Sequence, residues 1–232
     1  MDRLYTAKTL GEWVENRSLK QIKIGFVPTM GALHKGHISL IERAKSENDV
    51  VICSIFVNPT QFNNASDLTN YPRTIDSDII LLEEAGCDAV FIPSVTEMYP
   101  DYPKTTTFVD VPLAPLNQVM EGAFRKGHFE GVVNVVYRLF DLVKPNSAYF
   151  GLKDFQQVAI IKHMVKYLKL PVEIVPCSTM RTEEGLAKSS RNARLSETQK
   201  EEALVIYNTL RLGKSLAQSA NPIEVREKMV EF

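Results

Sequence analysis

Two histidines three positions apart, His34 and His37, follow an apolar run and a glycine-bearing turn. The run Ile22–Val27 leads into Pro28-Thr29-Met30-Gly31-Ala32-Leu33, which predicts a strand that breaks at Pro28, turns at Gly31 and enters a helix carrying His-x-Gly-His. A helix N-terminus presents unpaired N–H groups to an anion, and imidazoles add further donors. The segment therefore favours a phosphate site over two histidines that only make hydrogen bonds at a helix start. No acidic or cysteine partner stands at ligand spacing, so no metal site is predicted.

Two basic segments could neutralise such a phosphate. Lys153 stands at a predicted strand-to-helix junction, where its ammonium group can meet an anion. Asp154 with Gln157 three residues later also fits a capping box, which would explain these two residues without function. The polar segment Lys188-Ser189-Ser190-Arg191-Asn192 would alone be an ordinary turn. Together with His-x-Gly-His, it resembles the mobile basic loop that clamps triphosphate in class I adenylating enzymes.

Amide side chains follow another apolar run. Asn58 and Gln61 come directly after Val50–Val57, and they could be a turn and a solvated amide. At the ligand edge of a sheet, amides fix hydroxyl and carboxylate groups, which favours a substrate site. The loop Glu121–Gly131 is an ordinary cationic surface loop unless it borders the same cleft, in which case Arg125 gains interest.

The elements that must position these residues alternate along the chain. Apolar runs with helical periodicity between most of them predict a parallel sheet covered by helices on both faces. The runs are Ile22–Val27, Val50–Val57, Asp88–Ile92, Ala148–Gly151 and Val172–Cys177. Apolar residues at helical spacing lie on one face of a predicted helix: Phe155, Val158, Ile161, Val165 and Leu168. The fold class is therefore α/β, a Rossmann-like doubly wound sheet with ligands at the carboxyl ends of its strands.

A change in pattern near residue 180 divides the chain. Residues 1–179 are expected to form the nucleotide- and substrate-binding domain, and residues 180–232 a small, incomplete C-terminal helical subdomain that carries the Lys188–Arg191 loop. In this second part, Ser196-Glu197-Thr198-Gln199 predicts a capping box that opens a long helix, and another helical pattern starts at Pro222.

Composition narrows the class of protein. Among 232 residues, 27 basic and 28 acidic side chains give a net charge of −1, which favours neither nucleic acid nor an anionic membrane as partner. The eight-residue run Val50–Val57 cannot span a bilayer, and no apolar stretch follows the first residues. Cys53, Cys87 and Cys177 are far apart and fit buried reduced thiols. We expect a cytoplasmic enzyme or binding protein.

Four segments, in this order and spacing, resemble the pantothenate synthetase (pantoate–β-alanine ligase) family of the His-x-Gly-His nucleotidyltransferase superfamily. They are Pro28–His37, Phe56–Phe62, Gly151–Gln157 and Ser189–Asn192. The resemblance implies a ligase that makes pantothenate from (R)-pantoate and β-alanine through a pantoyl adenylate, releasing pyrophosphate and AMP. It further implies ATP as a substrate, Mg²⁺ carried by the ATP phosphates, and a homodimer. The family often has a hydrophobic residue in place of Lys188 and a longer C-terminal domain.

The resemblance also assigns roles to residues. His34, His37, Lys153 and Arg191 would be catalytic, Gln61 and Gln157 would bind pantoate, and Asn58 would lie beside the approach of β-alanine. The ATP site would comprise Met30, Gly31, Ala32, Leu33, His34, Lys35, Gly36, His37, Gly151, Leu152, Lys153, Asp154, Met180, Lys188, Ser189, Ser190 and Arg191. The family treats His37 as a proton donor. We expect it instead to hydrogen-bond to the triphosphate.

Two other hypotheses compete with this one. Another nucleotidyltransferase of the same superfamily would carry a phosphate-binding cluster in place of Asn58, Gln61 and Gln157, whereas these amides favour a small hydroxy acid. A non-catalytic nucleotide-binding homologue would usually lack His34, His37 or Lys153, and all three are present.

Overall fold

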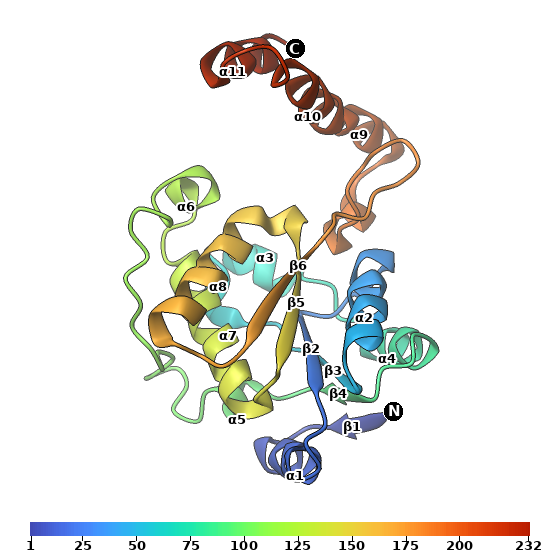
Figure 1. The fold of residues 1–232 in the computed structure, drawn as a ribbon, viewed down its shortest axis with the longest axis vertical. Helices are drawn as coiled ribbons and strands as arrows, with labels where there is room; N and C mark the ends of the chain where they lie inside the picture. Colours follow the sequence, from blue (N-terminus) through green and yellow to red (C-terminus); the bar gives the residue numbers. More distant parts are fainter. The chain divides into compact units, whose positions relative to one another are not determined.

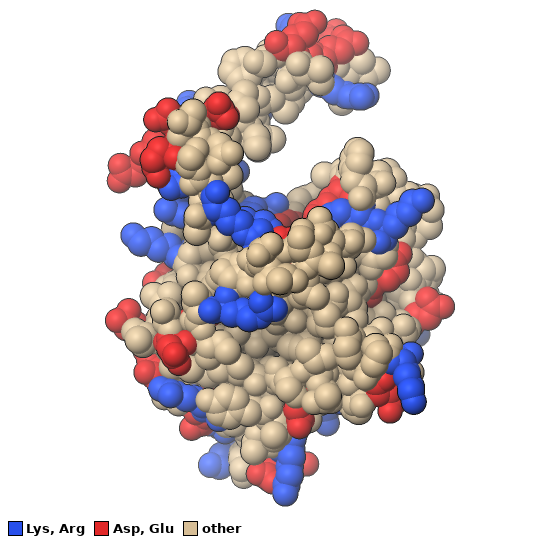
Figure 2. Space-filling model, turned by 180° about the vertical axis from the view of Figure 1, so that it is seen from behind, with Lys and Arg blue, Asp and Glu red and all other residues tan.

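The computed structural model describes all 232 residues, which divide into two compact units, Met1–Ser178 and Thr179–Phe232. The first unit is an α/β domain built on one sheet, and the second consists of a short loop region and helices (Figure 1). No helix combines the length and the apolar composition needed to cross a membrane. Figure 2 shows Lys and Arg side chains interspersed with Asp and Glu over the face drawn.

A six-stranded, all-parallel sheet forms the centre of the first unit. Its strands are β1 (Asp2–Leu4), β2 (Ile24–Thr29), β3 (Val50–Ile55), β4 (Ala89–Phe91), β5 (Ser147–Gly151) and β6 (Glu173–Cys177). Their order across the sheet is β1-β4-β3-β2-β5-β6, so the chain winds outward in both directions from β2 and β3. This order confirms the predicted Rossmann-like, doubly wound fold.

Helices cover both faces of this sheet. The first unit contains α1 (Ala7–Ser18), α2 (Lys35–Glu47), α3 (Ala65–Thr69), α4 (Ile75–Glu84), α5 (Val95–Met98), α6 (Met120–Phe124), α7 (His128–Val143) and α8 (Phe155–Leu168). Helices α7 and α8 lie on one side of the sheet and α2 and α4 on the other (Figure 1). The buried apolar residues form two cores, one on each face of the sheet. Phe26 belongs to one core, where its ring packs against Phe140 of α7, and Val27 belongs to the other, together with Ile41 of α2. The alternation of a strand's side chains produces these two cores.

One interpretation of the sequence around α8 needs correction. On the apolar face of this helix Val158 and Ile161 are buried, whereas Phe155 at the first position is 61% exposed. Asp154 precedes the helix without capping it, so the predicted Asp154–Gln157 capping box is wrong. The Asp154 carboxylate instead accepts a hydrogen bond from the Lys153 ammonium group at 2.7 Å.

Strand β2 continues through Pro28, where a break was predicted. Pro28 lies in register with Ser54 of β3, and the next residue, Thr29, accepts the Phe56 N–H at 3.0 Å. Along a central strand, the backbone N–H and C=O groups of successive residues face the two neighbouring strands in turn. The Thr29 carbonyl faces β3, so the Pro28 nitrogen points toward β5. The β2–β5 pairing ends at Phe26 and Ala148, where the next bond would need an N–H at residue 28, so Pro28 stays in the sheet through its pairing with β3 alone.

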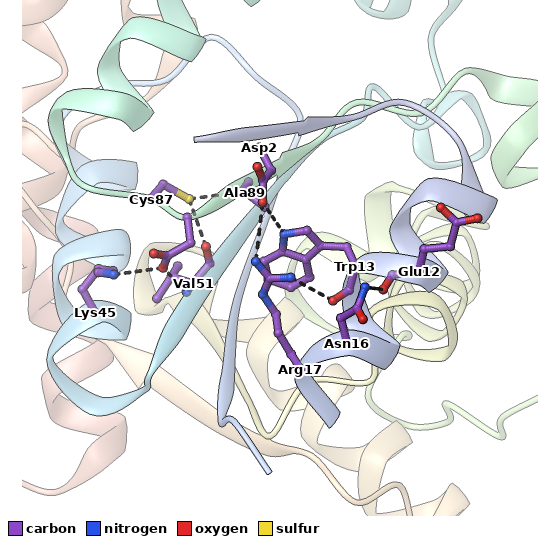
Figure 3. A network of polar contacts seen from close by, with 10 residues as sticks. Asp2, Glu12, Trp13, Asn16, Arg17, Lys45, Val51, Cys87 and Ala89 are labelled. Atoms are coloured by element: carbon purple, nitrogen blue, oxygen red, sulfur yellow. Dashed lines mark hydrogen bonds and ion pairs between the residues drawn. The ribbon is translucent and has the colours of Figure 1, made fainter. Parts of the chain in front are cut away.

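The edge strand β1 went unrecognised in the sequence because it has only three residues. Its Asp2 accepts a hydrogen bond from the Trp13 indole at 2.8 Å, and Arg17 stacks over the same indole ring (Figure 3). Asp88, which immediately precedes β4, pairs with Lys45 of α2 at 2.9 Å and accepts the N–H of Val51 in β3 at 2.6 Å. These contacts fix the strand ends opposite the carboxyl edge.

The second unit consists of α9 (Glu197–Glu202), α10 (Leu204–Leu216) and α11 (Pro222–Glu231), preceded by a loop. Ser196 and Gln199 form the predicted capping box, but the expected long helix is interrupted at Ala203. Tyr207 of α10 packs directly over Gly185, whose φ of +114° suits only glycine. The Arg181 guanidinium stacks on the same ring, which joins the loop to the helix.

Candidate active site

Three adjacent strands deliver most of the predicted residues to one edge. The sheet order places β3, β2 and β5 side by side, and all run in the same direction. His34 and His37 follow β2, Asn58 and Gln61 follow β3, and Lys153 follows β5. Because parallel strands end at the same edge, residues from three distant parts of the sequence meet there.

A strained turn connects β2 to α2, and a buried carboxylate holds it. Gly31 has φ +81° and Ala32 has φ +50°, both in the left-handed region. Asp78 of α4, 1% exposed, accepts the N–H of Ala32 at 2.9 Å and that of Leu33 at 2.8 Å. A Cβ on Gly31 would lie 3.0 Å from the same carboxylate, so the glycine allows this approach. The sequence interpretation missed Asp78, since nothing in its own surroundings indicates this partner.

The two histidines cap their helix reciprocally. His34 is the N-cap of α2, and its Nδ1 accepts the N–H of Gly36 at 3.1 Å. The Nδ1 of His37 accepts the N–H of His34 at 3.3 Å, and the rings lie with centroids 4.1 Å apart. An N–H can only donate, so both Nδ1 atoms are unprotonated and each neutral ring carries its proton on Nε2. The capping contacts thus place two Nε2–H donors beside a helix N-terminus.

His37 is held in its neutral form. Burial, followed by the nearby His34 and then Lys153, lowers the pKa of His37 from 6.5 to about 3. The influence of Lys153 also shows that the residues following β2 and β5 belong to one electrostatic environment. At physiological pH a neutral imidazole can donate a hydrogen bond, but it cannot act as an acid in the way that a protonated imidazolium does. This agrees with a role in binding an anion.

Lys153 lies on the short 3-10 helix η2 (Leu152–Asp154), between β5 and α8. Its side chain is 38% exposed and pairs with the half-exposed Asp154 carboxylate. Such an exposed pair contributes little to stability, so the ammonium group can exchange this partner for a more highly charged phosphate.

Asn58 differs from the expectation drawn from the sequence. Its side chain is 1% exposed, and its amide is engaged by the protein. Its Nδ2 donates to the Gly131 carbonyl and to Oε1 of Gln61, while its Oδ1 accepts from Thr60 and from the Tyr99 hydroxyl. A direct contact with β-alanine would require breaking these bonds.

Gln61, at the end of the 3-10 helix η1 (Pro59–Gln61), links two predicted segments. Its Nε2 donates to the Met30 sulfur at 3.3 Å, which places it beside the turn before α2. The loop before α7 also reaches it: the Gln61 carbonyl accepts from His128 at 2.8 Å and from Arg125 at 3.4 Å. Burial lowers the pKa of His128, and its Nδ1 carries the proton because a carbonyl only accepts. Arg125 therefore does border this edge.

Gln157 lies on the first turn of α8 and is partly buried. The remaining predicted ATP ligands belong to the second unit. There the Lys188 N–H donates to the Met180 carbonyl at 2.9 Å, and Ser189 caps the 3-10 helix η3 (Ser190–Arg194) by accepting the Arg191 N–H. The serine-rich segment thus forms an ordered turn with cationic side chains.

Comparison with known proteins gives consistent matches. The family model described as pantoate-beta-alanine ligase matches residues 3–231. A pantothenate synthetase of Bacteroides thetaiotaomicron is 51% identical over 231 residues, covering 100% of this chain and 80% of that protein. One from Aquifex aeolicus is 47% identical over 212 residues, covering 91% and 74%.

Solved structures match over the whole chain as well. The crystal structure of pantothenate synthetase from Thermus thermophilus superposes with a TM-score of 0.91 at 44% identity, covering 100% of this chain and 81% of that one. A pantoate-beta-alanine ligase from Francisella tularensis, complexed with beta-gamma ATP and beta-alanine, gives a TM-score of 0.86 at 44% identity, with coverage of 100% and 85%.

Proposed function

Because the chain belongs to the pantoate–β-alanine ligase family, we propose that its carboxyl-edge site performs the two half-reactions of that family. The protein is an ATP-dependent ligase that condenses pantoate with β-alanine to give pantothenate. In the first half-reaction, a pantoate carboxylate oxygen attacks the α-phosphorus of ATP, and the bond to the bridging oxygen breaks to release pyrophosphate. In the second, the β-alanine amine attacks the acyl carbon of the adenylate, loses a proton and displaces AMP.

The reciprocal cap of His34 and His37 is the observation that carries this assignment. It fixes two Nε2–H donors at the N-terminus of α2, where backbone N–H groups also favour an anion. Negative charge that develops on the phosphate oxygens is stabilised by donors already in place, without reorganisation. Lys153 supplies a positive charge to the same phosphates.

The acid being activated is bound by amides. Gln61 and Gln157 hold pantoate through its hydroxyl and carboxylate oxygens, and Met30 lies against the Gln61 amide. Gly151, Leu152 and Asp154 line the nucleotide site together with the turn Gly31–His37. The assignment of Met180, Lys188, Ser189, Ser190 and Arg191 to ATP binding stays a prediction from the family resemblance. For Arg191 the predicted role is to neutralise the leaving pyrophosphate.

Mg²⁺ arrives with ATP as part of the substrate. The structure contains no group of three or more His, Cys, Asp or Glu side chains placed to hold a metal ion. Mg²⁺ is commonly bound through substrate phosphates with few protein ligands. The imidazole, amide and ammonium groups at this edge fit that arrangement, because they donate to phosphate oxygens and do not coordinate the metal ion. A cytoplasmic location and a homodimer stay predictions, the latter to be checked by light scattering of the purified protein.

Pantoate-dependent exchange of labelled pyrophosphate into ATP, with β-alanine omitted, tests the proposal. Exchange requires only the first half-reaction, so it should proceed with pantoate and ATP alone. A requirement for β-alanine, or exchange with unrelated acids but not with pantoate, would contradict the assignment. A nucleotide-binding protein without catalysis would give no exchange while still binding ATP in calorimetry.

A further inference from the structure

Tyr99 is a buried phenol whose hydroxyl reaches Asn58, shortly after the carboxyl end of β3. It follows α5, has no exposed surface, and is packed among the rings of Phe56, Tyr102 and Phe108. Its hydroxyl donates to the Oδ1 of Asn58 at 2.8 Å. Nothing about the sequence around Tyr99 indicates a role in the site.

The orientation of the Asn58 amide is determined by its neighbours. Its Oδ1 accepts the Thr60 N–H at 3.3 Å, and its Nδ2 donates to the Gly131 carbonyl at 3.3 Å. A backbone N–H only donates and a carbonyl only accepts, so reversing the amide would oppose like groups at both ends. The Tyr99 hydroxyl adds a third, shorter contact in the same sense.

Asn58 in turn determines the orientation of the Gln61 amide. The Nδ2 of Asn58 donates to the Gln61 Oε1 at 3.1 Å, which leaves Nε2 on the opposite side, 3.3 Å from the Met30 sulfur. Gln61 therefore presents N–H donors, and no acceptor, toward the segment that precedes the histidine pair. A ligand there must offer an acceptor, such as a carboxylate or hydroxyl oxygen.

We propose that Tyr99 and Asn58 are positioning residues for the adenylation step. Tyr99 holds Asn58, Asn58 holds the Gln61 amide with its NH₂ group toward the bound hydroxy acid, and neither residue touches the substrate. This inference rests on the proposed function, in which Gln61 binds pantoate.

Two further features agree with it. Burial raises the pKa of Tyr99 to about 12, so its hydroxyl remains a donor throughout the range of an enzyme assay. The α7 helix approaches η1 very closely at Gly131, where a Cβ would lie 2.6 Å from the Thr60 carbonyl oxygen. The Gly131 carbonyl that orients Asn58 is therefore placed by tight packing.

The experiment is a double-mutant cycle between Tyr99→Phe and Gln61→Ala, read by pantoate-dependent pyrophosphate exchange. Tyr99→Phe removes only the hydroxyl, and it should raise the KM for pantoate about fivefold to tenfold, the effect of one lost hydrogen bond. The KM for ATP should change less than about twofold, since the histidine pair is intact. In the Gln61→Ala background, Tyr99→Phe should have no further effect on the KM for pantoate.

Tyr149→Phe is the matched control. Tyr149 is also buried, and its hydroxyl is bonded to Glu47 and Asn48 at the other end of the sheet, so the KM for pantoate should stay unchanged. Asn58→Ala provides a second cycle with Gln61→Ala and the same expectation. Independent, multiplying effects in either cycle would overturn the inference. If the wild-type protein shows no pantoate-dependent exchange, the proposed function fails instead, and the two failures are thus distinguishable.

Discussion

The Nδ1 of His37 accepts the backbone N–H of His34, and this single contact joins a structural and a chemical role. A pair of histidines at a helix start could serve as caps or as ligands. Here the cap uses one nitrogen of each ring and leaves the other protonated, as a donor. The bonds that stabilise the helix start therefore also orient the two Nε2 donors that we propose to bind an anion.

Substitution of His37 should separate the two nitrogens. His37→Asn keeps an acceptor near the Nδ1 position and lacks the Nε2 donor, whereas His37→Gln can place its amide N–H near the Nε2 position. We expect His37→Asn to lower kcat about a hundredfold, the size of one lost oxyanion donor, and His37→Gln to recover part of it. Steady-state kinetics of both variants measure this, with circular dichroism to verify folding. Equal losses in the two variants would argue against a donor role for Nε2.

Lys153→Ala should lower turnover at least about a hundredfold, on the order of 3 kcal/mol of transition-state stabilisation. The physical reason is the loss of a positive charge beside the triphosphate. The control is Lys162→Ala. Lys162 is an exposed lysine on α8, the helix that follows Lys153, and its loss should leave turnover unchanged. A decrease of less than about threefold for Lys153→Ala would remove this residue from the mechanism.

Asp78→Asn should disturb the turn that precedes α2. The new amide can accept one of the two backbone N–H groups of Ala32 and Leu33 but faces the other with a donor, at a cost of about 1–3 kcal/mol in the free energy of unfolding. We also expect a higher KM for ATP. Urea denaturation and initial rates measure both effects. Asp76→Asn, an exposed acid in the same first turn of α4, should change neither quantity.

The stability of the first unit should fall as the pH decreases below about 6.5. The pKa of His37 is lowered to about 3, so between these values the unfolded chain binds a proton that the native protein does not. At pH 5 this costs on the order of 2 kcal/mol relative to pH 8, and the lowered pKa of His128 acts in the same direction. Urea denaturation of wild type and His37→Asn at both pH values checks it. The decrease should be smaller in the variant, and an equal decrease would mean that His37 titrates normally.

Sequence pattern by itself was sufficient for the parallel sheet, the turn at Gly31, the helix start at His34 and the location of the motifs at strand ends. These features depend on local residue types and on periodicity, which neighbouring residues determine. Pattern failed where the backbone depended on a neighbour in space: Pro28 stays in β2 because it remains paired with Ser54 of β3, and Asp154 bonds Lys153 in preference to capping α8.

The chemistry inside the site was decided by tertiary structure. Asp78 reaches the turn at Ala32 from 46 positions away, and Tyr99 reaches Asn58 from 41. Burial and neighbouring charges determine the protonation of His37, and the contact with Gly131 of α7 helps to orient the Asn58 amide. Hydrogen-bond direction and pKa are properties of groups brought together by folding. The types and order of the residues therefore predict which residues form the site, but not which of their atoms donate hydrogen bonds.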